Sequence, residues 1–294
     1  MAGDFHLDDR SVRRHFNRAA ASYDGADVLA RSVAQQMDER LEGIIHQPET
    51  ILDLGCGTGR DLHRLAERYP KALRVGVDIA PAMLSRAAPP ASGLQRLFGR
   101  RGRAQVVAAD ARALPFAANR FDMLWSNLML NWLDDPAPAL AEMARVMKVD
   151  GMLMFATLGP DTLRELRDAL GDPHGARVHR FIDMHDIGDA LVGAGFSNPV
   201  MDMDRLTLTY AELDTLFADL RQSGSTNASG LRHRGLSGKH GWQRARARYE
   251  ACRTNGRLPA TFEIVYGHAW KPAPRTTADG HAIIRFQSRT DAAR

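Results

Sequence analysis

Residues 51–59, with the sequence ILDLGCGTG, restrict the fold of this 294-residue chain more than any other segment. A short apolar run containing one acid passes into three alternating glycines. Glycine adopts backbone torsions that other residues avoid and lets a ligand approach the main chain closely. The pattern is therefore typical of a buried strand that turns tightly beside a ligand and enters a helix. A dinucleotide fingerprint needs G-x-G-x-x-G. Because Arg60 stands where its third glycine should be, a different ligand is indicated.

Two further acids follow apolar runs. Asp78 ends the run VGVD, nineteen residues after Gly59, and Asp110 ends the run VVAAD. The carboxyl ends of parallel strands form the ligand-binding edge of an open α/β sheet, so both acids are expected beside the glycine turn. There Asp78 could accept hydrogen bonds from both hydroxyls of a ribose, and Asp110 from the amino group of an adenine. Taken singly, such an acid is more often a helix cap or a turn residue. Together with the glycines, the two acids predict an adenosine-containing ligand.

Short apolar strands alternate with helical stretches around the glycine turn. Two helices come first, at 8–18 and 26–45, with a turn between them. Strands are then expected at 51–54, 73–77, 105–108, 121–126 and 152–156, and helices at 59–69, 81–88 and 136–147. Such alternation needs right-handed crossovers and gives a parallel sheet with helices on both faces. We therefore predict a doubly wound α/β fold.

The pattern changes after residue 157. Further helices are expected at 160–170, 184–194, 210–222 and 240–253, and further strands at 199–208 and 261–270. We predict an inserted loop at 89–103, a mobile loop at 223–239 and a partly disordered tail from Pro272.

The acids and glycines together carry a family resemblance. Over residues 48–157 the chain resembles the class I S-adenosylmethionine-dependent methyltransferases. The resemblance implies a Rossmann-like, mostly parallel sheet of seven strands, with S-adenosylmethionine as methyl donor and S-adenosylhomocysteine as product. It also implies the residues that bind this cofactor, namely Asp53, Gly55, Gly57, Gly59, Asp78, Ile79, Asp110, Ala111 and Asn127. The Asn127 amide is expected at the methionine end.

No general base is evident in the sequence. Methyl transfer needs alignment and a nucleophile, and it needs a base only if that nucleophile carries a proton. Neither cysteine is placed as a nucleophile, and no Asn-Pro-Pro-Tyr signature of amide-nitrogen methyltransferases follows the fourth strand. No recognisable catalytic motif contains any of the histidines considered, which are His15, His63, His174, His179 and His185. A carboxylate, already ionised at pH 7, fits this absence.

Four longer segments narrow the resemblance. They are FNRAAASYD at 16–24, WSNLMLNW at 125–132, FATLGPDTLRELR at 155–167 and FIDMHDI at 181–187. This set is similar to the malonyl-acyl-carrier-protein O-methyltransferases of biotin synthesis, which methylate the free carboxyl of a carrier-bound malonyl group. The similarity departs at the arginine-rich stretch 96–103 and in the tail.

This narrower resemblance implies roles and boundaries. Tyr23 would belong to a lid over the methyl donor, and Trp132 would line the pocket for the methyl acceptor. The malonyl carboxylate calls for the planar fork of an arginine, with Arg180 as first choice and Arg164 as second. The chain would divide into lid helices, a cofactor-binding core, a cap with the last strands, and a tail. Their ranges are 1–46, 47–158, 159–271 and 272–294.

Three alternatives stay open. GSTNA at 224–228 and WKP at 270–272 also resemble mitochondrial complex I assembly factors of this fold, some of which hydroxylate an arginine. A small-molecule methyltransferase of another substrate class is a second alternative, because a fold does not fix a function. A non-catalytic scaffold is the third, and the intact glycine turn with both adenosine acids argues against it.

The composition and charge of the chain limit the kinds of partner that it is expected to bind. The chain has a net charge of +4, two cysteines and no apolar run near the ~20 residues of a membrane span. Its N-terminus does not look like a signal peptide. We therefore expect a cytoplasmic monomer that binds no metal, membrane or nucleic acid. Two arginine-rich stretches, 96–103 and 232–253, are candidate docking surfaces for an acidic acyl carrier protein. The second is preferred because it lies in the cap.

Overall fold

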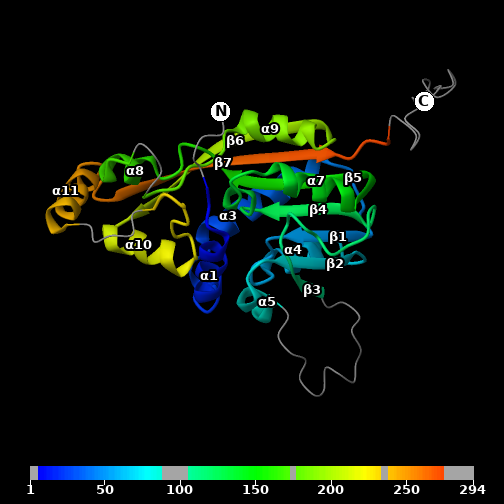
Figure 1. Cartoon of the computed structure of the whole chain (residues 1–294), viewed down its shortest axis with the longest axis horizontal. Helices are drawn as coiled ribbons and strands as arrows, with labels where there is room; N and C mark the ends of the chain where they lie inside the picture. The colour runs from blue at the N-terminus through cyan, green and yellow to red at the C-terminus, as the bar shows by residue number, and fades with distance from the viewer. Residues whose placement is uncertain (1–5, 88–104, 173–176, 233–237, 275–294) are drawn as a thin grey trace, which may run out of the picture.

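The computed structural model describes residues 6–87, 105–172, 177–232 and 238–274 (Figure 1). In this part of the chain seven strands form one sheet, in the order β3-β2-β1-β4-β5-β7-β6. The strands are β1 (Thr50–Leu54), β2 (Leu73–Asp78), β3 (Gln105–Ala108), β4 (Phe121–Asn127), β5 (Met147–Leu158), β6 (Ser197–Tyr210) and β7 (Leu258–Trp270). β1 to β5 pair in parallel, whereas β7 runs antiparallel between β5 and β6. The predicted mostly parallel seven-stranded sheet is confirmed.

The helices fall into three groups along the chain. Before the sheet come α1 (Asp9–Ala19), α2 (Tyr23–Ala26), α3 (Val28–Arg40) and the 3-10 turn η1 (Leu41–Gly43). Between the parallel strands lie α4 (Arg60–Arg68), α5 (Pro81–Ala87), η2 (Leu130–Trp132) and α7 (Ala137–Val146). After β5 come α8 (Arg164–Leu170), α9 (Met184–Gly193), α10 (Leu213–Gln222) and α11 (Lys239–Glu250). No helix in the described ranges is long and apolar enough to cross a membrane.

The central strands bury side chains on both faces. Successive residues of a strand point to opposite faces of the sheet, and here Ile51 and Leu52 of β1 enter two different apolar clusters. The cluster of Ile51 includes Val33 of α3. The cluster of Leu52 includes Leu140 of α7 and Ile187 of α9. Helices therefore cover both faces, as a doubly wound fold requires.

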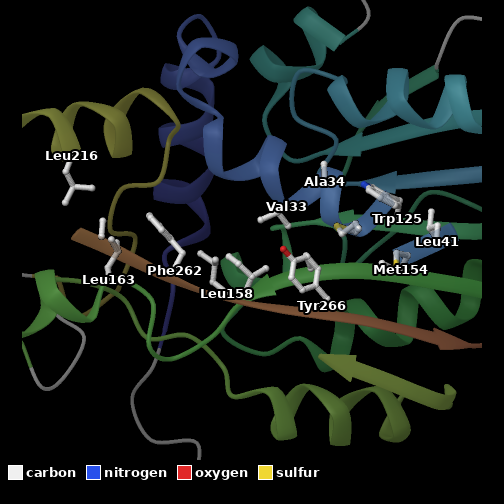
Figure 2. Packing of buried hydrophobic residues seen from close by; sticks show 14 of the residues in the cluster. Val33, Ala34, Leu41, Trp125, Met154, Leu158, Leu163, Leu216, Phe262 and Tyr266 are labelled. Carbon is white, nitrogen blue, oxygen red and sulfur yellow. The ribbon is translucent and has the colours of Figure 1, made fainter. Parts of the chain in front are cut away.

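The cap consists of α8, α10 and α11 at one end of the long strands β6 and β7 (Figure 1). One apolar cluster extends from the sheet into this cap. It contains Trp125 of β4, Val33 of α3, Phe262 of β7 and Leu216 of α10, which Figure 2 shows along one layer. The cap thus shares its core with the sheet.

Several boundaries differ from the sequence-based expectation. Residues 23–26 form the short helix α2 where a turn was expected, and α8 begins only at Arg164. Strands β6 and β7 are longer than expected because they pair with each other from Ser197 and Trp270 to Tyr210 and Leu258.

The prediction of a mobile loop at 223–239 was wrong for its first part. Ala228 and Ser229 are buried. An isolated bridge joins Leu7 to Ser229, and the Asp8 amide donates to the Ala228 carbonyl oxygen at 2.8 Å. The N-terminal segment therefore ties down this loop. The predicted insertion at 89–103 and most of the predicted tail lie outside the described residues.

Candidate functional site

A cavity of about 640 Å³ opens at the C-terminal ends of β1, β2 and β4. Small-molecule sites commonly measure ~300–1,000 Å³, so the cavity can hold a ligand of cofactor size. One part of its wall is polar and includes Gly57, Asp78 and Asn127. Another part is aromatic and includes Trp132 and Phe181. Residues of α1, α2, α3 and the cap complete the lining.

The three glycines of the turn all adopt positive φ angles, of 78°, 52° and 84°. A Cβ atom on Gly55 would lie 2.6 Å from Met129 Cβ, and one on Gly59 would lie 2.9 Å from Ala87 Cβ. Glycine is therefore needed at these two positions because neighbouring residues occupy the space that a side chain would fill. Gly55 and Gly57 line the cavity, whereas Gly59 does not. At Gly57 the nearest neighbour of such a Cβ would be the Tyr23 ring at 3.8 Å, an ordinary van der Waals distance, so the backbone there is less crowded than at the other two glycines.

Asp78 lines the cavity at the end of β2, beside Ile79. Its Oδ2 accepts a hydrogen bond from the Gly57 amide at 2.9 Å, and its Oδ1 accepts one from the Ala80 amide at 2.8 Å. Burial raises the pKa of this carboxyl, and the two amides oppose that rise. Each oxygen keeps a second lone pair. Asp78 can therefore organise the turn and still accept hydroxyl groups.

Asp110 and Ala111 line the cavity after β3. The Arg112 guanidinium donates to both Asp110 oxygens and also to Asp9 Oδ2 on α1, at 2.6 Å. Arg112 holds the pKa of Asp110 below its usual range. The acid expected to meet an adenine is thus already bound to an arginine that connects the sheet edge to α1.

Asn127 presents an unsatisfied oxygen at the end of β4. Its Nδ2 donates to the Ala30 carbonyl oxygen and to Asp61 Oδ2, each at 3.0 Å. Both partners are acceptors, so the orientation of the amide is fixed. Its Oδ1 is buried and has no hydrogen-bond partner among the described residues. Asp61 Oδ2 also accepts from Trp125 Nε1 at 2.9 Å.

Asp53 lies behind the turn and does not line the cavity. Its side chain is fully buried, and burial raises its pKa well above the ordinary value, with Asp61 and Asp78 adding to the rise. One carboxyl oxygen has no hydrogen-bond partner in the described chain. Asp53 was expected to bind the cofactor, but it is buried and is not among the residues that line the cavity.

An ion pair and a hydrogen bond attach the N-terminal helices α2 and α3 to the glycine turn. Tyr23 on α2 lines the cavity, and burial raises its pKa. Arg60, at the position where a dinucleotide fingerprint has glycine, forms an ion pair with Asp27 at 2.6 Å. Thr58 Oγ1 donates to Asp24 Oδ1 at 2.5 Å. The residues after the glycines thus hold α2 and α3 over the turn.

The aromatic wall is built by three segments far apart in sequence. The Trp132 ring lies 5.1 Å from the Phe16 ring of α1 and 5.1 Å from the His179 ring. The His179 ring in turn lies 4.7 Å from that of Phe181. All four residues line the cavity. Trp132 was expected here, whereas His179 had no assigned role.

The two arginines considered for a substrate carboxylate lie elsewhere. Arg180 and Arg164 are exposed, and neither lines the cavity. Arg164 is near Asp161 and Glu165, both at 3.8 Å. Arg177 does line the cavity, close to its exposed edge. No cluster of side chains that could hold a metal ion occurs in the described part of the chain.

The polar side fits S-adenosylmethionine. Asp78 offers acceptors for ribose hydroxyls at the end of β2, and the bare backbone of Gly57 leaves room beside it. The buried Asn127 Oδ1 offers an acceptor suited to an ammonium group. The aromatic side would receive the methyl acceptor.

Comparisons with known proteins agree with this geometry. Residues 52–155 match the family described as "Methyltransferase domain". The chain is 50% identical to the malonyl-(acyl-carrier protein) O-methyltransferase of Laribacter hongkongensis, over 97% of this chain and 98% of that one. It is also 50% identical to the protein of the same name from Gallionella capsiferriformans, over 96% and 97%.

Solved structures share the fold. The YcgJ protein of Bacillus subtilis superposes with a TM-score of 0.56 at 17% identity, covering 82% of this chain and 99% of that one. Phosphoethanolamine N-methyltransferase 2 of Haemonchus contortus, in complex with S-adenosyl-L-methionine, gives a TM-score of 0.52 at 14% identity. That match covers 87% of this chain and 57% of the other.

Proposed function

Since the chain belongs to the malonyl-(acyl-carrier protein) O-methyltransferase family, we propose that it methylates the free carboxylate of a malonyl group carried by acyl carrier protein. The methyl ester so formed would serve biotin synthesis. One structural observation supports the proposal independently of the names of the relatives. A single cavity is lined both by polar groups suited to the methyl donor and by aromatic side chains suited to a small acceptor. Methyl transfer requires the two ligands side by side.

When bound, S-adenosylmethionine supplies a methyl group whose bond to sulfur breaks as its bond to a carboxylate oxygen forms. Asn127 Oδ1 would accept a hydrogen bond from the ammonium group at the methionine end, and Asp78 would accept hydrogen bonds from the ribose hydroxyls. The Tyr23 ring lies beside Gly57, and Trp132 with Phe16 would exclude water from the acceptor side. Holding both reactants in line can supply ~7–11 kcal/mol of the barrier reduction.

The site needs no general base for this reaction. A malonyl carboxylate has a pKa near ~4 in water and is already an anion at pH 7, so no proton has to leave before attack. Burial raises the pKa of Tyr23, so the phenol stays protonated at pH 7 and cannot take up a proton as a base. The described cavity therefore contributes alignment and shielding.

Methyl transfer to malonyl thioesters tests the proposal directly. The protein is incubated with methyl-labelled S-adenosylmethionine and either malonyl-carrier or acetyl-carrier. We expect label only with malonyl-carrier, and we expect mild base to release it as methanol, because the product is an ester. Label that resists base, or equal labelling of acetyl-carrier, would contradict carboxyl methylation.

For the carrier we propose a dock on α11. Trp242 and Arg246 of this helix line the cavity, so α11 forms part of its rim. Arg246 pairs with Asp214 and lies over the Trp242 ring, with its guanidinium carbon 5.7 Å from the ring centre. Arg244 and Arg248 are exposed and form no ion pair within the described residues. They offer free positive charge to an acidic carrier.

A further inference from the structure

We propose that His179 binds the carboxylate of the methyl acceptor through its Nε2–H group. The inference rests on the proposed function and names a residue that positions the substrate. His179 would hold one carboxylate oxygen and leave the other free to attack the methyl group.

The first support is an unsatisfied nitrogen. The His179 side chain is 6% exposed, and its Nε2 is buried without a hydrogen-bond partner among the described residues. More than about 90% of buried polar groups in proteins have a partner, and leaving one unpaired costs about 1–3 kcal/mol. His179 lines the cavity. A ligand in that cavity is the natural partner for Nε2.

The second support is location. The His179 ring lies between Trp132, at 5.1 Å, and Phe181, at 4.7 Å. Trp132 ends η2, the short turn that comes after β4, and the last residue of β4, Asn127, belongs to the polar side of the cavity. The imidazole is therefore on the acceptor side, where a malonyl group would lie. The aromatic rings on both sides fix the plane of the imidazole and so the direction of its N–H.

The third support is charge. Burial lowers the pKa of His179 to about 4, and the Arg167 guanidinium adds to the effect. The imidazole is then neutral at pH 7 and can donate one N–H. As the methyl group transfers, the carboxylate loses its negative charge. A full cation would therefore stabilise the starting carboxylate more than the transition state, which slows the reaction. A neutral donor positions the carboxylate with less of this penalty.

Two substitutions separate hydrogen bonding from packing. His179→Phe keeps a flat ring between Trp132 and Phe181 but has no donor. His179→Gln places an amide N–H near the position of Nε2. Arg180→Gln is the matched control, because Arg180 is a nearby exposed residue that does not line the cavity.

The test measures binding of malonyl-CoA and acetyl-CoA to the enzyme loaded with S-adenosylhomocysteine, by calorimetry. We expect His179→Phe to weaken malonyl-CoA about tenfold, the worth of one hydrogen bond to a charged group, without changing acetyl-CoA or S-adenosylhomocysteine. His179→Gln should recover much of the loss, and Arg180→Gln should bind like the unsubstituted enzyme.

Three outcomes would overturn the inference. They are unchanged malonyl-CoA binding in His179→Phe, an equal loss of both thioesters, or a tenfold loss in Arg180→Gln. If the unsubstituted enzyme neither methylates malonyl-CoA nor prefers it to acetyl-CoA, the proposed function fails instead. The two failures are therefore distinguishable.

Discussion

Asp61 fixes the orientation of the Asn127 side-chain amide. One oxygen of its buried carboxylate accepts both Trp125 Nε1 and Asn127 Nδ2. We expect Asp61→Ala to free the amide and to weaken S-adenosylhomocysteine binding by roughly 3–10-fold, the worth of one hydrogen bond. Binding of 5′-methylthioadenosine, which lacks the amino acid part, should stay unchanged in calorimetry.

The conservative variant Asp61→Asn is the control for that prediction. One amide oxygen can accept both hydrogen bonds, so Asp61→Asn should bind S-adenosylhomocysteine nearly as tightly as the unsubstituted protein. If Asp61→Asn loses as much affinity as Asp61→Ala, the carboxylate acts through its charge and the positioning role is wrong.

Asp78 connects the turn to the ligand. Asp78→Ala removes the acceptor for the Gly57 amide as well as the acceptors for a ribose. Each charge-assisted hydrogen bond contributes about 1.5–3 kcal/mol, and ~1.4 kcal/mol corresponds to tenfold in affinity. We therefore expect S-adenosylhomocysteine and 5′-methylthioadenosine to lose at least about tenfold each in calorimetry, since both carry the ribose. Near-normal affinity for either ligand would exclude ribose binding by Asp78.

At the scale of elements, α11 is expected to act on the carrier and not on the chemistry. Reversing Arg244 and Arg248 to Glu should raise the Michaelis constant for malonyl-carrier several-fold and leave that for malonyl-CoA unchanged, because CoA lacks the carrier surface. The difference should shrink with salt, since the screening length falls from ~10 Å at 0.1 M to ~3 Å at 1 M.

A charge-matched control uses two basic residues at the N-terminal ends of the parallel strands, opposite the end where the cavity lies. Lys71 and Arg120 are exposed, lie just before the N-terminal ends of β2 and β4, and do not line the cavity. Reversing both should change neither Michaelis constant. If this control impairs malonyl-carrier as strongly as the α11 variant, net charge explains the effect and a specific dock does not.

At the scale of the whole molecule, the shared core predicts that cap and sheet unfold together. Leu216 of α10 is 1% exposed and belongs to the cluster that includes Trp125 (Figure 2). We expect Leu216→Ala to cost ~2–5 kcal/mol and to move one calorimetric transition down by several degrees, at ~2–4 °C per kcal/mol. The control Val192→Ala, at a residue 58% exposed, should have little effect. A second, separate transition for the cap would contradict the shared core.

The sheet, the glycine turn and the class of cofactor were predictable from the amino-acid sequence. Short apolar runs and glycine torsions are local properties, and the carboxyl ends of parallel strands meet at one edge of the sheet. Gly57 and Asp78 were therefore predicted at the cavity, the family resemblance added Asn127, and all three residues line it. Exact helix ends were not predictable in this way, because pairing such as that of β6 with β7 extends elements beyond their local pattern.

Which side chains form the aromatic part of the cavity wall could not be predicted locally, because it depends on how distant segments pack. His179 precedes an arginine in a segment without periodic pattern, so nothing local shows that the histidine is buried and the arginine exposed. Asp61 is an acid on an amphipathic helix, and its role arises from Trp125 and Asn127, more than sixty residues away. Burial and hydrogen bonding between distant segments follow from how the elements pack, and that packing is a property of the whole chain.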